Sequence, residues 1–159
     1  MQTWKGWPLE RLIYLFLAVA YLVVWAQIYL FHGVMAEFEH KAQVIPVIVT
    51  PIIALSALWY ALSRVQLARI TFLAMFWLAV VTGLMGMFYH IEGVGEMEGG
   101  YTLQNFAFGP PVLLPLTYTA LAIMGLAVAM WPVKLTAPDF EQDYTEVQAT
   151  RRYRGRTPA

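Results

Sequence analysis

The sequence predicts an all-α fold, a four-helix transmembrane bundle built from two tandem, parallel two-helix repeats. Composition is the first observation: 60% of the 159 residues are hydrophobic and only 13% are charged, against about 45–50% and about 25% in soluble domains. The second is the presence of four long uncharged runs, and the third is an uneven distribution of charge between the segments that flank them. These observations predict a multi-pass integral membrane protein, placed in a bacterial cytoplasmic membrane.

Each uncharged run is close to the roughly 20 residues that a helix needs to cross a bilayer. The apolarity is continuous rather than alternating, which favours helices over the strands of a membrane barrel. A single membrane domain over residues 1–132 is therefore expected, followed by a polar, partly disordered cytoplasmic tail over residues 133–159. The predicted helices are Leu12–Phe31, Val44–Leu62, Ile70–Tyr89 and Pro111–Trp131.

The first and third runs begin and end alike. Arg11 precedes the first run and His32 follows it, and Arg69 and His90 stand at the same separation around the third. An aromatic residue comes directly before each histidine. The pattern predicts an internal repeat, which would bring His32 and His90 to matched depths in the membrane.

Two prolines at matching separations follow each histidine and extend the repeat. The predicted halves, about 11–62 and 69–131, share one orientation and are related by an axis along the membrane normal. The inner proline of each pair removes a backbone hydrogen bond and should kink its helix. The kinks either open a small cavity or only adjust the packing, and the sequence alone favours the packing adjustment. The pairs are Pro46 with Pro51 and Pro110 with Pro115.

The segments at the two ends of the bundle differ in charge. The N-terminus, the link between the second and third helices and the tail hold nine Lys or Arg and five Asp or Glu. The other two links hold one Lys and five Glu. Because an excess of Lys and Arg marks the cytoplasmic side, both termini are predicted in the cytoplasm and all three histidines at the extracytoplasmic face.

The extracytoplasmic links concentrate side chains that bind metals. Imidazole and carboxylate groups together suit divalent ions such as Zn, Cu, Fe or Mn. We therefore predict a site for such an ion, in a metal carrier or accessory factor rather than an enzyme. The candidate ligands are His32, Glu37, Glu39, His40, His90 and Glu92, with Glu96 and Glu98 nearby.

A motif within this cluster depends on where the first helix ends. If that helix continues past the membrane edge, Glu37 and His40 form an i, i+3 pair. Their spacing, Glu-x-x-His, is the unit that di-iron carboxylate bundles use. The second half of the chain has no equivalent, so the motif by itself does not predict an oxidase.

Two other functional classes stay open. His32 and His90 could bind a b-type haem between neighbouring helices, with Gly83 and Gly86 as the small residues nearby, in a haem or metal-dependent redox protein. Alternatively, the chain is a non-catalytic subunit or scaffold of a larger membrane complex. The four runs contain no charge, so no proton relay is indicated. The absence of cysteine excludes thiolate ligands and disulfide exchange.

The expected partners follow from composition. They are the lipid bilayer and either other membrane subunits or further copies of the chain. The basic cluster at residues 151–156 predicts contact with anionic lipid headgroups. No pattern typical of a nucleic-acid-binding fold accompanies it, so no nucleic acid is predicted.

The charge division gives a testable topology. A reporter protein that works only in the cytoplasm should be active when it is fused after Ala159, because the basic flanks hold both termini on that side. A second fusion within residues 97–101 should report the opposite compartment. An extracytoplasmic reporter at Ala159 would contradict the prediction.

Overall fold

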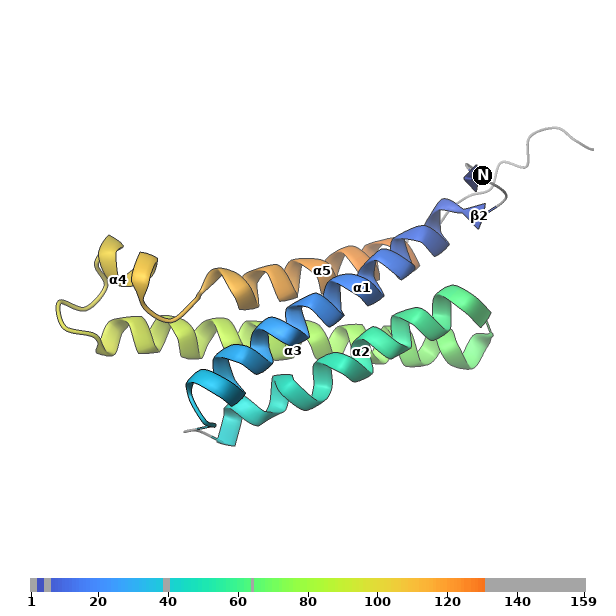
Figure 1. The fold of residues 1–159 in the computed structure, drawn as a ribbon. Helices are drawn as coiled ribbons and strands as arrows, with labels where there is room; N and C mark the ends of the chain where they lie inside the picture. Colours follow the sequence, from blue (N-terminus) through green and yellow to red (C-terminus); the bar gives the residue numbers. More distant parts are fainter. Residues whose placement is uncertain (1–2, 5–6, 39–40, 64, 131–159) are drawn as a thin grey trace, which may run out of the picture.

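The computed structural model describes residues 3–4, 7–38, 41–63 and 65–130. The regular structure of the described chain is helical apart from two strands of two residues each (Figure 1). Strand β1 (Thr3–Trp4) pairs antiparallel with β2 (Trp7–Pro8). Four segments of the described chain are long and apolar enough to cross a membrane. They are compatible with a small multi-pass membrane protein and confirm the helical fold class. The predicted tail lies outside the described residues.

The helices follow in a simple order. Helix α1 (Leu9–Tyr29) continues as the π-helix η1 (Leu30–Met35), and the 3₁₀ turn η2 (Lys41–Gln43) leads into α2 (Val44–Ser63). Helix α3 (Gln66–Glu96) is the longest, and the short α4 (Leu103–Phe108) and α5 (Leu113–Met130) come after it.

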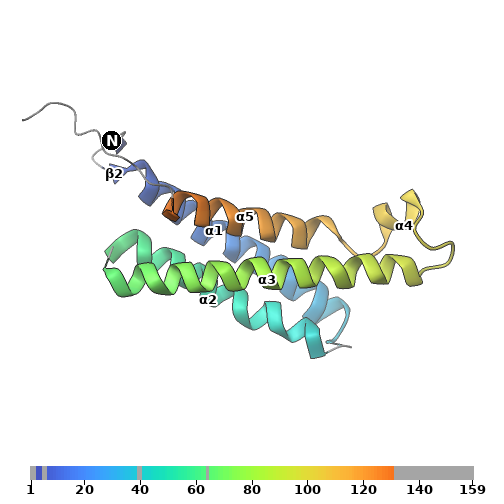
Figure 2. The same cartoon turned by 180° about the vertical axis from the view of Figure 1, so that it is seen from behind.

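The four long helices form two packed pairs that cross at an angle (Figures 1 and 2). Helix α1 packs on α2, α3 packs on α5, and α2 with α3 and α1 with α5 complete the bundle. The start of α1, the α2–α3 connection and the end of α5 lie at one end, and η1, η2 and α4 lie at the other. A symmetry between the two halves, and the orientation of the bundle in a membrane, stay predictions.

Aromatic rings from all four long helices pack in the core. The buried residues of α1, Tyr14 to Ile28, recur at spacings of three and four, as the inward face of a packed helix does. Tyr21 is fully buried, and its ring centre lies 5.5 Å from that of Phe76 on α3 and 5.0 Å from that of Tyr118 on α5. Its hydroxyl donates a hydrogen bond of 2.9 Å to the carbonyl of Tyr118. This bond joins α1 to α5 at mid-bundle.

Glycine allows α5 to approach α3 closely. A Cβ atom at Gly125 would overlap the ring of Phe76 and lie 3.1 Å from Cδ1 of Leu17. Between membrane helices there is little hydrophobic driving force, so close contact through small residues supplies much of the association. Phe76 occupies the space that a side chain at position 125 would take.

Pro51 lies inside α2 and has no N–H to donate to the carbonyl of Val47, four residues earlier. The indole N–H of Trp25 on α1 donates to that carbonyl instead, at 2.9 Å. In hydrocarbon an unpaired carbonyl is costly, so the proline creates an acceptor that attaches α1 to α2.

The third helix is longer than predicted. The sequence placed its end at Tyr89, whereas α3 continues to Glu96 despite Gly93 and Gly95. Glycine lowers helix propensity, but here it serves packing: a Cβ atom at Gly93 would lie 3.2 Å from Cγ of Pro110. Contact with the segment before α5 thus outweighs the local preference.

The helical pairing of Glu37 with His40 required the first helix to continue past Glu37, and it does not. Regular α-helix ends at Tyr29 and π-helix at Met35, and Glu37 and Phe38 then adopt positive φ angles of 46° and 53°. Those angles turn the chain out of the helix, so Glu37 cannot form a helical i, i+3 pair with His40. Glu39 and His40 themselves lie outside the described residues.

The Trp25–Val47 bond predicts a conditional effect on stability. Trp25→Phe should lower the free energy of unfolding by about 1–3 kcal/mol, because it leaves the Val47 carbonyl without a donor. In a Pro51→Ala background the backbone N–H of residue 51 is available, so the same change should matter less. Thermal unfolding in detergent of the single and double variants measures this coupling.

The matched control is Trp77→Phe on α3, where the side chain is 54% exposed. Equal losses from Trp25→Phe with and without Pro51 would show that the indole contributes only packing.

Candidate functional site

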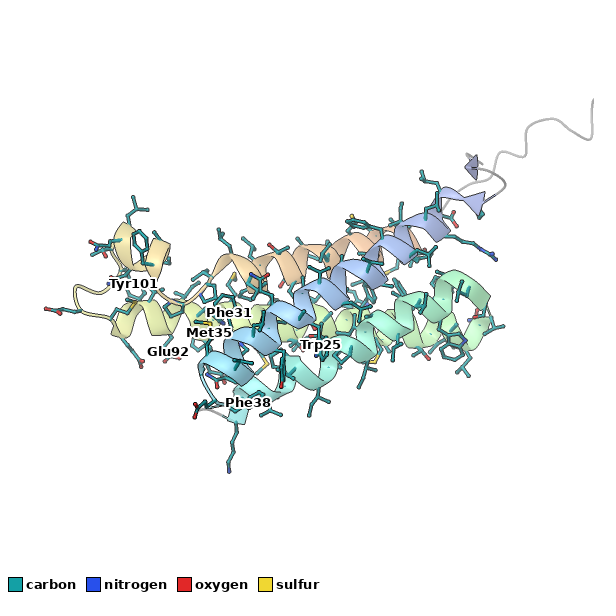
Figure 3. All side chains as sticks on the ribbon, in the orientation of Figure 1. Trp25, Phe31, Met35, Phe38, Glu92 and Tyr101 are labelled. Atoms are coloured by element: carbon teal, nitrogen blue, oxygen red, sulfur yellow. The ribbon has the colours of Figure 1, made fainter. Side chains whose placement is uncertain are left out.

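A partly open cavity of about 780 Å³ lies between the two helix pairs, at the end of the bundle that carries η1 and α4. Its wall comes from η1, the start of α2, the second half of α3 and the start of α5. Along α3 it runs from Thr82 to Glu96, about 21 Å at a rise of 1.5 Å per residue. Figure 3 shows Phe31 from η1 and Glu92 from α3 at this end.

His32 reaches the cavity through the π-helical turn. The amide of Ala36 donates to the carbonyl of Phe31, five residues earlier, at 3.1 Å. A π turn holds more residues than an α turn, and such turns are frequent at functional sites. The buried face of α1 ends at Ile28, and the wider turn lets both Phe31 and His32 line the cavity.

His90 continues the buried face of α3, which includes Phe72, Phe76, Ala79 and Gly83. It lies between two glycines, one packed against α5 and the other against the segment before α5. A Cβ atom at Gly86 would lie 3.3 Å from Cβ of Pro115, and Gly93 faces Pro110. Packing on both sides of His90 therefore holds this part of α3 against the proline segment.

The two imidazole rings are neighbours. Their centres lie 5.9 Å apart and their planes meet at 66°. Both rings are half-buried, and Nδ1 of His90 is buried without a hydrogen-bond partner among the described residues. An unpaired buried polar atom is unfavourable unless a ligand, ion or water satisfies it.

The predicted acidic residues divide into three groups. Glu92 and Glu96 line the cavity and are exposed, so they lie at its rim. Glu37 and Glu98 do not line it; Glu98 lies in the turn after α3, where its carbonyl accepts a 3.0 Å hydrogen bond from Asn105. Glu39, like His40, is outside the described residues.

These positions do not make a complete metal site from side chains alone. Within the described residues, no group of three or more His, Asp or Glu is arranged to hold a metal ion. The cavity also has no Lys or Arg among its described lining residues. The structure brings together two imidazoles, with two carboxylates at the rim.

The prolines have different roles from those expected. A cavity is present where the sequence alone favoured a packing adjustment, and four prolines line it: Pro46, Pro110, Pro111 and Pro115. Pro51 does not line it; its effect is the Trp25 bond between α1 and α2.

Tyr118 is a cavity residue that the sequence reasoning missed. It is buried, lines the cavity, and its hydroxyl lies 3.3 Å from that of Thr50 on α2. The available signal was its spacing from Pro115, Ala122 and Gly125, which places all four on one face of α5.

Comparison with protein-family models, with curated proteins and with solved structures gives no match to this chain.

The proximity of positions 32 and 90 can be tested by cross-linking, because the natural chain has no cysteine. The double variant His32→Cys/His90→Cys should take up one short bis-maleimide and retain no free thiol, since the native rings are 5.9 Å apart. Intact mass measures the product. The control pair His32→Cys/Met130→Cys, at opposite ends of the bundle, should carry two linkers attached at one end only. The same product from both pairs would refute the juxtaposition.

Proposed function

We propose that this chain is a small membrane protein that holds a metal centre through the imidazoles of His32 and His90. The main observation behind this proposal is that the centres of the two rings lie 5.9 Å apart, on two helices that line one cavity. Two imidazoles that bind one metal at about 2.0–2.1 Å per nitrogen place their ring centres roughly 5–6.5 Å apart. The observed separation falls in that interval.

The unpaired nitrogen of His90 supports the same proposal. Nδ1 is buried without a partner among the described residues. A neutral imidazole nitrogen in that position can bind a metal directly, or it can carry the proton that fixes the orientation of a ring that binds through Nε2. Direct binding through Nδ1 would give this buried nitrogen a partner.

The rim suits entry of a cation. Glu92 and Glu96 are exposed at the mouth of the cavity, and no basic residue is among its described lining. We place this end of the bundle on the extracytoplasmic side, from the charge division of the sequence, so the centre would load from that compartment. The protein then acts as a carrier or accessory factor and not as a catalyst.

Metal analysis tests the proposal. Wild-type protein purified in detergent and incubated with zinc, copper or iron should retain about one metal centre per chain, and His32→Ala or His90→Ala should each lower retention by about tenfold or more. Bound metal should also be lost at acidic pH, because protons compete for imidazole nitrogens that must be neutral to bind.

Gln27→Ala is the matched control, since Gln27 is exposed on α1 and does not line the cavity. Equally low metal in the wild type and all three variants, with haemin as well as with the bare ions, would refute the metal centre and favour the scaffold alternative.

A further inference from the structure

The described side chains supply too few ligands for a single ion, and the cavity is larger than a single ion needs. Ions held by side chains alone, such as zinc, take three or four protein ligands, and the described residues bring together two imidazoles and no third His, Asp or Glu. The cavity measures about 780 Å³. A volume of about 300–1,000 Å³ is typical of pockets for small molecules and cofactors, far more than one ion needs.

A tetrapyrrole resolves this mismatch. Its ring supplies four nitrogens to the iron, so the protein needs to supply only axial ligands. We infer that the metal centre is a haem-type iron tetrapyrrole, bound between η1 and α3 with His32 and His90 on opposite faces. This inference rests on the proposed function and names its ligand class.

The separation of the two rings is close to that of axial ligands. On opposite faces of one iron at about 2.0–2.1 Å per nitrogen, two imidazoles have their ring centres roughly 6–6.5 Å apart, so the observed separation of 5.9 Å would have to widen slightly to admit the iron. Each axial imidazole contains the iron–nitrogen axis in its plane. Rotation about that axis is free, so the 66° between the rings is compatible with a shared iron.

The cavity wall suits a flat apolar molecule. Ile28, Phe31, Leu114 and Tyr118 supply apolar or aromatic surface from three segments. Sites for cofactors are mostly apolar with a few placed polar groups, and here the placed groups are the two imidazoles.

Charge sets the orientation of the ligand. Haem carries two propionates, which are hydrated most easily at the open rim of the cavity. The exposed carboxylates of Glu92 and Glu96 repel them there, but water screens this repulsion. Lys41 is exposed directly before Ala42 and Gln43 of the wall and offers one compensating charge.

One substitution at the rim should change the affinity for haem and the affinity for a bare cation in different ways. Glu92→Gln removes a negative charge at the rim. It should strengthen or leave unchanged the binding of dianionic haem, whereas it should weaken the binding of a divalent ion.

The experiment is a titration of the full-length protein in detergent with haemin, in parallel with zinc and copper. The wild type should bind one haemin and show the optical and electron paramagnetic resonance spectra of low-spin iron with two imidazoles. His32→Ala and His90→Ala should each give high-spin iron with one protein ligand, which added imidazole converts back to low spin. Phe88→Ala, exposed on α3, is the control and should bind as the wild type does.

A cavity-filling variant distinguishes the two proposals. Ala42→Trp retains both histidines but introduces an indole at the wall, so it should weaken haemin binding by about tenfold or more while affecting a bare ion little. Ala26→Trp, exposed on α1, is the matched control, and thermal unfolding verifies that each variant is folded.

Each outcome decides the inference. Zinc or copper binding that requires both histidines, without haemin binding, overturns the haem assignment and leaves the metal centre standing. Binding of neither overturns both. Haemin uptake that is unchanged in both histidine variants reflects partition into detergent and also overturns the assignment.

Discussion

The close contact between α3 and α5 is the constraint on which the candidate site depends. Gly125 admits the ring of Phe76 in the middle of the bundle, and Gly86 and Gly93 lie against Pro115 and Pro110 at the cavity end. Within lipid, such contacts hold helices together by close packing rather than by exclusion of water. They position the stretch of α3 that carries His90, and they bring the start of α5 into the cavity wall.

The first helix contributes its histidine by a different means. The indole of Trp25 attaches α1 to α2 at the carbonyl that Pro51 leaves without a donor. Beyond this attachment the helix widens into η1, and His32 enters the cavity wall. One imidazole thus stands on a regular helix and the other on a π turn. Both are half-buried, whereas Glu92 at the rim is exposed, so polarity increases from the bundle interior toward water.

Local sequence signals failed where distant contacts decide the backbone. The sequence placed the end of the third helix at Tyr89, yet α3 continues through Gly93 and Gly95, and Pro110 packs on Gly93. The predicted pairing of Glu37 with His40 required the first helix to continue through both residues. The chain instead leaves the helix, with positive φ angles at Glu37 and Phe38. Tyr118 drew no attention as one aromatic residue in an apolar run, and only the tertiary structure shows that it lines the cavity beside Thr50 of α2.

The sequence by itself determined the four helices and the end of the bundle at which His32 and His90 lie. It could do so because a backbone in hydrocarbon must pair with itself, and because each Arg-to-His interval corresponds to one helix long enough to cross a membrane. Only the tertiary structure decided that the rings lie 5.9 Å apart beside a cavity of about 780 Å³. The physical reason is that ring separation depends on crossing angles, on the π turn and on glycine contacts between helices, which involve residues far apart in the chain.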